Sequence, residues 1–144
     1  MEGSSAPTRL RPDLVRWIVQ RAHEHGTRLR PIQVVKFLYL ADLLQARTTR
    51  STLTGWTWRF WDFGPYCVES LDSVTQAIQQ DLVEAEKRPS KFSENDYTLL
   101  HPRATEMERA FVPEDLHPAV RGHLEAAIKQ FGGEPANFLD VGGG

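Results

Sequence analysis

The chain has 144 residues, of which 40% are hydrophobic and 25% are charged, and its formal net charge is −2. These values fit one globular domain with a single core and leave too little length for two independent domains. The single cysteine, Cys67, excludes an internal disulfide framework and a zinc site built from cysteines, which favours a reducing, intracellular setting.

No apolar run approaches the roughly 18 residues that a membrane span needs, and the first residues lack a signal-peptide pattern. We therefore expect a soluble, cytoplasmic protein. Charge is uneven along the chain: residues 1–50 contain 9 Lys or Arg and 4 Asp or Glu, whereas residues 51–144 contain 8 and 15. The halves carry +5 and −7, which predicts a surface with two electrostatic faces.

The first helix is predicted from Pro12, a residue favoured at the first helical position, to Gly26, which favours a C-terminal stop. Apolar residues recur at helical spacing between them, and we expect Arg16 and Arg21 to form a basic outer face. The small and polar residues 1–10 before it are typical of a mobile leader.

A second helix is predicted from Pro31, and its apolar residues occupy more than one face, which is typical of a buried central helix. Its polar members Lys36 and Asp42 are informative, because each must reach solvent, find a partner or border a groove. We interpret both as locally satisfied groups at the rim of the helix, with a partner-facing role as the alternative.

An aromatic segment follows. Residues 54–60 alternate with period two, which predicts a strand with Trp56, Trp58 and Phe60 on one side. Trp61 and Phe63 fall on the other side, so we expect a bulge or bend near residue 62. Gly64 and Pro65 then break the strand and, in our interpretation, re-aim the chain toward the next helix.

The third helix is predicted from about Val68 to Glu84, and residues 87–89 mark the stop that follows it. We expect its inward stripe to contain Leu71, Val74, Thr75, Ile78 and Leu82. A short hairpin is predicted with Phe92 and residues 97–100 on either side of a turn at 93–96.

Two further helical pieces are predicted, at residues 106–111 and 113–131. The inward face of the second should contain Leu116, Val120, Leu124, Ala127, Ile128 and Phe131. Together the elements predict an α+β domain, mostly α, over residues 11–141: a central buried helix surrounded by three or four helices, with a short aromatic strand and a small β-hairpin. Glycines 142–144 form a tail that is natural, or is left by truncation or cloning.

The aromatic segment and the helix before it carry a resemblance. Lys-Phe-Leu-Tyr-Leu-Ala-Asp at 36–42, Leu-Thr-Gly at 53–55 and Phe-Gly-Pro-Tyr at 63–66 resemble the Panacea domain, also described as SocA-like or phage-associated GepA-like. The match spans roughly residues 14–139. The positions that coincide with the family motif, which we interpret as structural, are Lys36, Leu38, Tyr39, Ala41, Asp42, Gly64 and Pro65.

The resemblance implies an antitoxin of a toxin-antitoxin system, which binds a cognate toxin protein directly and holds it inactive. It also implies an alternative, a proteolytic adaptor that delivers the toxin to an ATP-dependent protease. Relatives tend to finish with an apolar and aromatic segment containing a Thr-Glu-Pro-like stretch, from which this chain departs at residues 137–144. If that tail contributes to binding, this chain binds its partner differently.

The aromatic rings exceed what a small core needs, although most of them should still pack inside it. We expect one or two exposed rings to anchor a partner, because aromatic residues are enriched among interface hot spots. Nearby basic residues would steer the encounter. The candidate partner-binding residues are Trp56, Arg59, Trp61, Phe63, Tyr66, Arg47 and Arg50.

A DNA-binding regulator is the competing interpretation, because three helices followed by a hairpin resemble a winged-helix arrangement. The helix that would read DNA should be basic, yet residues 68–86 contain five acidic residues and no Lys or Arg. Nucleic acid is therefore an unlikely partner. No histidine spacing indicates a metal site and no residue pattern indicates a catalytic site, so we expect a protein that is not an enzyme and needs no cofactor.

Overall fold

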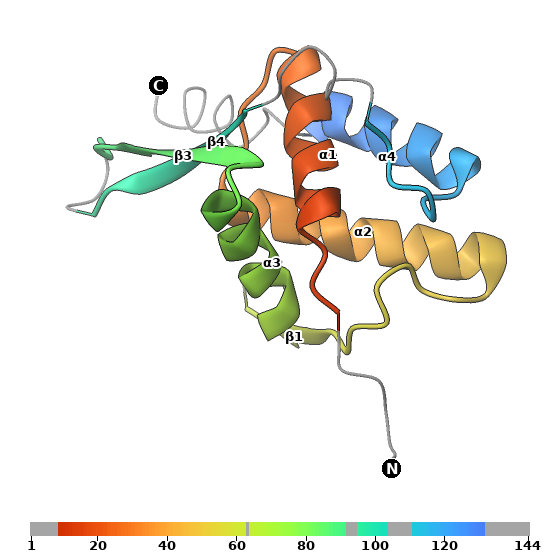
Figure 1. Cartoon of the computed structure of the whole chain (residues 1–144). Coiled ribbons are helices and arrows are strands. Elements are labelled where there is room, and N and C mark those ends of the chain that lie inside the picture. The colour runs from red at the N-terminus through yellow and green to blue at the C-terminus, as the bar shows by residue number, and fades with distance from the viewer. Residues whose placement is uncertain (1–8, 63, 92–94, 104–110, 132–144) are drawn as a thin grey trace.

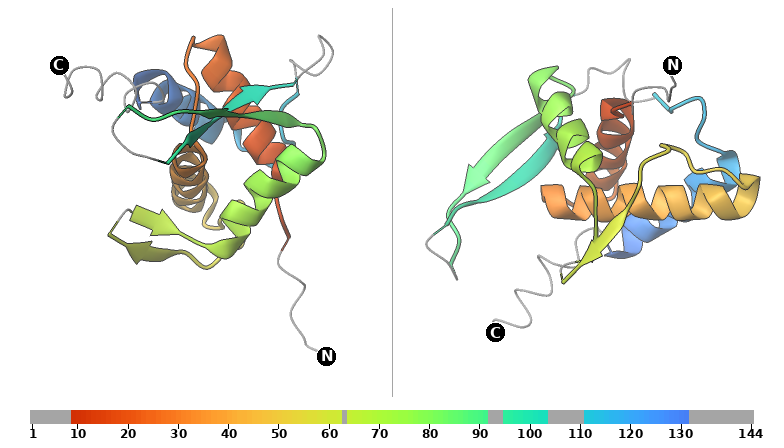
Figure 2. Two further views of the ribbon diagram at one scale, coloured as in Figure 1. Left: turned by 90° about the vertical axis from the view of Figure 1, so that its left-hand side faces the viewer. Right: turned by 90° about the horizontal axis from the view of Figure 1, so that it is seen from below.

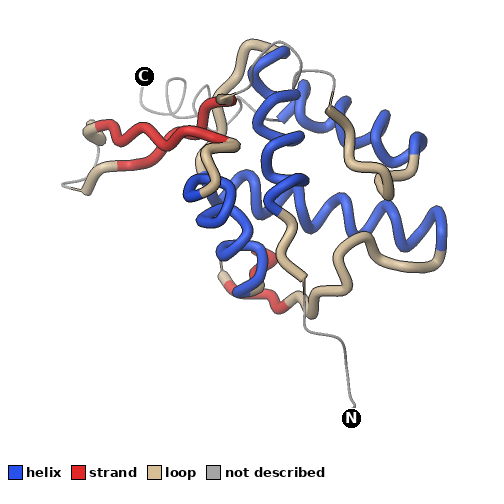
Figure 3. The backbone as a smooth tube through the Cα atoms, in the orientation of Figure 1, coloured by secondary structure: helices blue, strands red, loops and turns tan. Residues whose placement is uncertain are grey.

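A computed structural model describes residues 9–62, 64–91, 95–103 and 111–131 (Figure 1). Helices dominate, and the strands form two separate two-stranded antiparallel sheets, so the mostly α, α+β prediction is confirmed. The two sheets lie at opposite ends of one helix, α3 (Figure 3). In chain order the elements are α1 (Pro12–Glu24), α2 (Pro31–Thr49), β1 (Arg59–Trp61), β2 (Gly64–Tyr66), α3 (Val68–Gln79), β3 (Val83–Arg88), β4 (Tyr97–Pro102) and α4 (Pro118–Phe131).

Helix α1 begins and ends where the sequence predicts. Pro12 occupies its first turn, and Gly26 lies beyond its end with a positive φ of 77°. That conformation lets the amide of Thr27 donate to the carbonyl of Ala22 at 2.9 Å, which satisfies a carbonyl that the helix leaves open. Glycine is favoured here because a Cβ would strain a left-handed residue.

The basic outer face predicted for α1 is wrong. Arg21 forms an ion pair with Glu125 of α4, and the Arg16 guanidinium lies 5.1 Å from the ring centroid of Phe111. Both side chains are only partly exposed. Helical spacing alone could not show this, because the covering segment comes from more than ninety residues later in the chain.

Helix α2 is the centre of the molecule, as predicted. Seen along its axis, it lies between the β1–β2 hairpin on one side and α4 on the other (Figure 2). Its residues Val34, Val35, Leu38 and Ala41 are at most 1% exposed and pack in a core with α1, α3 and α4. Within the described residues no helix combines the length and hydrophobicity that a bilayer span requires.

Helix α3 is shorter than predicted, and its inward face is confirmed only in part. Val74 is buried, and Ile78 and Leu82 pack against the core as predicted. It ends at Gln79, and residues 83–88 form β3 instead of continuing the helix. The left-handed Asp81, with a φ of 58°, marks the break. Its buried residues are small, which lets α3 approach its neighbours closely, whereas Leu71 and Thr75 are exposed; the buried residues are Ser70, Ser73, Val74 and Ala77.

The hairpin exists, but its first strand was misplaced. Strand β3 pairs with β4 from Val83 opposite Pro102 to Arg88 opposite Tyr97. Residues 97–100 are therefore in a strand as predicted, whereas Phe92 lies outside the described residues. Leu29, between α1 and α2, adds an isolated bridge to Leu100, so β4 is fastened to the helical core.

Helix α4 begins at Pro118, five residues later than predicted, because residues 113–117 form a turn. Gln45 of α2 holds this turn by donating to the Asp115 carbonyl at 2.7 Å and accepting from the His117 amide at 3.2 Å. The inward face is confirmed at Leu116 and at most of the α4 positions, but Phe131 is exposed. The helix predicted at 106–111 falls largely outside the described residues, and Phe111 itself is not helical.

Candidate protein-binding surface

The loop after α2 is organised by one carboxylate. Asp42 is 2% exposed and accepts four hydrogen bonds. Its Oδ1 accepts from the amides of Leu53 and Thr54, each at 2.9 Å, and its Oδ2 accepts from the Thr54 hydroxyl at 2.5 Å and the Trp58 indole N–H at 2.8 Å. A buried carboxylate that is satisfied in this way fixes the path of residues 53–58.

A chain of aromatic contacts extends from that loop to β1. Trp58 meets Tyr39 edge to face, with centroids 5.4 Å apart, and Tyr39 meets Phe60 in the same way at 5.4 Å. Such pairs contribute about 0.5–1.5 kcal/mol beyond the area they bury. Asp42 and Tyr39 of the rigid central helix thus position the first strand of the hairpin.

The predicted strand at 54–60 is mostly wrong. Residues 54–58 form the loop held by Asp42, and the strand β1 covers only Arg59–Trp61. It pairs with β2, so Gly64 and Pro65 belong to a strand that the sequence did not predict. Hydrogen bonds that Asp42 accepts replace the ladder that the period-two pattern suggested. Trp56 donates from its indole N–H to the Arg9 carbonyl at 2.8 Å.

We expect a Gly64→Ala variant to lose about 1–2 kcal/mol of stability, because Gly64 has a φ of 112°, a region that residues with a side chain rarely adopt. The nearest atom to an added Cβ is the Lys36 Cε at 3.6 Å, so strain and not a clash is the cause. Urea unfolding measures the effect. Gly122→Ala, in α4 with open space around it, is the matched control and should gain about 0.5–1 kcal/mol; equal effects would contradict the strain argument.

The hairpin exposes large apolar side chains. Phe60 is 65% exposed and Trp61 is 64% exposed, and Trp61 lies beside Tyr66 with ring centroids 5.0 Å apart. The chain continues from Tyr66 directly into α3, whose first turns expose Val68 and Leu71. We use the name aromatic ledge for Phe60, Trp61, Tyr66, Val68 and Leu71. As adjacent strand residues, Phe60 and Trp61 point to opposite faces of the hairpin, Phe60 toward Tyr39 and Trp61 toward Tyr66.

Six of the seven predicted partner-binding residues lie in the described part of the chain, and they divide into three groups. Arg59 and Trp61 are exposed on β1, and Tyr66 on β2 is partly exposed. Trp56 is only 5% exposed and belongs to the core, so its expected place among the exposed rings is wrong. Phe63 lies outside the described residues.

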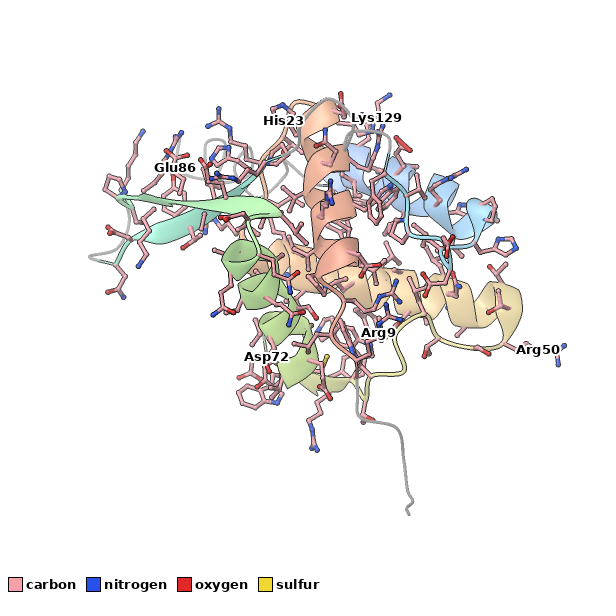
Figure 4. All side chains as sticks on the ribbon, viewed as in Figure 1. Arg9, His23, Arg50, Asp72, Glu86 and Lys129 are labelled. Atoms are coloured by element: carbon pink, nitrogen blue, oxygen red, sulfur yellow. The ribbon has the colours of Figure 1, made fainter. Side chains whose placement is uncertain are left out.

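The third group, Arg47 and Arg50, is exposed but distant from the ledge. Arg50 directly follows the last turn of α2 (Figure 4), whereas the β1–β2 hairpin contacts earlier residues of that helix, Lys36 and Tyr39. At about 1.5 Å per residue, Arg50 is roughly 16 Å along the helix axis from Tyr39, on which Phe60 packs. The structure therefore does not bring these two arginines together with the exposed rings.

The motif residues take different places. Leu38 and Ala41 are fully buried in the core, Tyr39 and Asp42 hold the aromatic segment, and Lys36 is exposed beside Gly64. The interpretation of Asp42 as a locally satisfied group agrees with its four hydrogen bonds. Val68 and Leu71 were missed as surface residues, because a helical stripe read from hydrophobicity assigns such residues to the core.

The single cysteine, between β2 and α3, is a buried free thiol. Burial raises the pKa of the Cys67 thiol, although Ser70 opposes this through its hydrogen bonds, so the thiolate nucleophile is disfavoured. Among the described residues no three His, Cys, Asp or Glu side chains gather as metal ligands.

The comparisons with known proteins agree with the resemblance seen in the motif. The sequence model of the family described as "Antitoxin SocA-like, Panacea domain" matches residues 34–138, about three quarters of the chain. No curated protein and no solved structure matches. The match begins within α2 and includes the loop held by Asp42, the aromatic ledge and α4. On this match, the chain belongs to the family of SocA-like antitoxins with a Panacea domain.

Proposed function

We propose that this protein is an antitoxin that binds its cognate toxin protein directly and inhibits it by occluding the toxin's working surface. The observation that carries the proposal is the exposure of Phe60 and Trp61, about two thirds each, on a hairpin fastened to the central helix. Membership of an antitoxin family supports the nature of the partner. Residues 11–141 would form the binding domain.

The exposed rings are held in place by neighbouring rings, which favours tight binding. A large aromatic side chain removed from water contributes strongly to an interface, and a ring already held in place loses little conformational freedom on binding. Trp61 lies against Tyr66, and Phe60 lies against Tyr39. The ledge is therefore organised before a partner arrives, with Arg59 as a neighbouring polar contact.

The order of the elements supports the DNA-binding alternative, but the charge of α3 does not. The succession of α1, α2, α3 and the β3–β4 hairpin, with the Leu29 bridge to β4, resembles that of a winged helix. The only charged residues of α3 are Glu69 and Asp72, and both would repel phosphate. A protein partner fits this surface better than nucleic acid does.

We expect a Trp61→Ser variant to bind the toxin about 30-fold more weakly, corresponding to about 2 kcal/mol, with no loss of fold because the side chain is exposed. The protein encoded next to this chain is the first toxin candidate. It should be lethal alone, harmless with the wild-type chain, and lethal again with Trp61→Ser or Phe60→Ser.

Phe131→Ser is the matched control, because Phe131 is an exposed ring on α4, across α2 from the hairpin (Figure 2). It should neutralise the toxin as the wild-type chain does. If the folded Trp61→Ser and Phe60→Ser variants neutralise the toxin fully, the ledge is not the binding surface.

A further inference from the structure

The charges along the aromatic ledge show what kind of partner segment fits it. Residues 60–86, which run from β1 through α3 into β3, contain six Asp or Glu and no Lys, Arg or His. In a chain with 17 basic and 19 acidic residues, this is a long stretch of one sign. It includes all five residues of the ledge.

Four of the acids are available to a partner. Glu84 is paired with Arg103, and Glu86 is paired with Arg88 and His101. The remaining four have no ion-pair partner among the residues that the structure describes, and they are Asp62, Glu69, Asp72 and Asp81. No salt bridge within the described part of the chain therefore offsets these four carboxylates.

Two of these acids alternate with the apolar residues of the ledge. Val68 and Leu71 are exposed on the first turns of α3, and Glu69 and Asp72 directly follow them. Asp72 lies on the outer side of the end of α3 that adjoins β1 (Figure 4). Two basic side chains also lie at the hairpin: the exposed Arg59 pairs with Tyr66 across the two strands, and Lys36 of α2 lies beside Gly64.

We propose that the aromatic ledge binds a cationic amphipathic helix of the partner, with its apolar side chains on Trp61, Tyr66 and Leu71 and its Lys or Arg residues facing Glu69 and Asp72. Apolar contact supplies the adhesion, and the acids give steering and orientation. The acids of the ledge would attract a basic partner surface, whereas the steering expected from Arg47 and Arg50 would attract an acidic one. The inference depends on the proposed function only for the identification of the partner as a toxin.

The probes are two fluorescein-labelled helical peptides of about 18 residues with the same Leu and Trp stripe, one with Lys and one with Glu on the polar face. Fluorescence anisotropy with the full chain measures their affinities. The Lys peptide should bind at least about tenfold tighter than the Glu peptide and should weaken as NaCl rises, because salt screens exposed charges.

Two variants locate the effect. The double variant Glu69→Lys/Asp72→Lys should bind the Lys peptide at least about tenfold more weakly than the wild type. Trp61→Ser should also bind this peptide more weakly. The matched control is Glu114→Lys with Asp96→Lys, which makes the same change in net charge at exposed acids away from the ledge residues. It should change affinity by less than about twofold, since screening limits distant charges.

Four results would overturn the inference. These are equal affinity for the two peptides, equal effects of the two double variants, no binding of the Lys peptide, and a dimer of this chain that dissociates in Trp61→Ser, which would make a second copy the occupant. If toxin binding depends on Trp61 but not on Glu69 and Asp72, only this inference fails. If the Lys peptide behaves as expected but no toxin is neutralised, only the proposed function fails.

Discussion

An Asp42→Ala variant should lose about 4 kcal/mol of unfolding free energy and should lose toxin binding as well. Asp42 accepts four hydrogen bonds in a site that is 2% exposed, and its removal leaves two amides, a hydroxyl and an indole N–H without their acceptor. Each unpaired buried donor costs about 1–3 kcal/mol, partly recovered where water can enter. Urea unfolding at pH 7 measures the loss.

The effect on binding follows from the ring contacts. Trp58 is held by Asp42, Tyr39 contacts Trp58, and Phe60 contacts Tyr39, so release of Trp58 loosens the mounting of β1. Asp42→Asn should fall between the wild type and Asp42→Ala, because one amide oxygen still accepts. Asp62→Ala, an exposed aspartate of the hairpin, controls for the loss of charge and should change stability by less than about 0.5 kcal/mol. A loss equal to that of Asp62→Ala would refute the organising role.

The helices were predictable from local sequence where strong signals marked their ends. Pro12 and Pro31 begin helices, and Gly26 follows one with a left-handed conformation. The all-round hydrophobicity of α2 correctly placed it at the centre, because such a helix must be covered by others. These signals depend on a few neighbouring residues and need no knowledge of the tertiary structure.

The prediction errors arose where residues distant in the sequence determine the local structure. The period-two pattern at 54–58 predicted a strand, yet the carboxylate of Asp42, twelve residues before Thr54, satisfies that backbone in another way. In α3 the hydrophobic stripe pointed to Leu71, but the close approach of α3 to its neighbours selects the small side chains Ser70 and Ser73. Hydrophobicity ranks residues for burial and does not measure the space available to them.

The candidate site was predictable in part. A surplus of rings correctly indicated that some must remain exposed, and Trp61 was named among them. Which rings are buried could not be read from the sequence, because Trp56 and Phe60 belong to the same alternating pattern and only the core contact of Trp56 separates them. The acidic run that follows the rings was visible in the sequence, but its place beside the ledge required the fold.

An Arg11→Met variant should lose about 3 kcal/mol, because the Arg11 guanidinium joins three parts of the molecule at a site that is 4% exposed. It donates to the Leu53 carbonyl at 3.3 Å and forms ion pairs with Asp13 and Asp115, whereas the bond from the Arg11 amide to Ser73 Oγ of α3 is kept in the variant. Arg11→Lys keeps the charge but not the planar fork, so it should recover less than half of the loss.

The Arg11–Asp115 pair should also give stability a defined pH dependence. Partial burial alone would raise the pKa of Asp115, but the hydrogen bonds and charge of Arg11 lower it below its usual value. Burial alone would lower the pKa of Arg11, yet the two carboxylates raise it, so Arg11 stays charged throughout. A carboxyl whose pKa is lower in the folded state stabilises fully above its unfolded value of about 3.9, and its contribution is lost as the pH falls through the folded value.

Comparison of the wild type with Asp115→Asn isolates this contribution from the other carboxylates. The difference in unfolding free energy should be about 1 kcal/mol at pH 7, since the Asp115 side chain is 52% exposed and solvent screens the pair. It should shrink toward zero as the pH falls from about 3.9 through the lowered folded-state pKa of Asp115, because the carboxyl is then protonated in both states. A difference that stays constant over the whole acid range in which the chain remains folded would show that the carboxyl stabilises by shape or neutral hydrogen bonding, and the ionic link from the start of α1 to the turn before α4 would then be refuted.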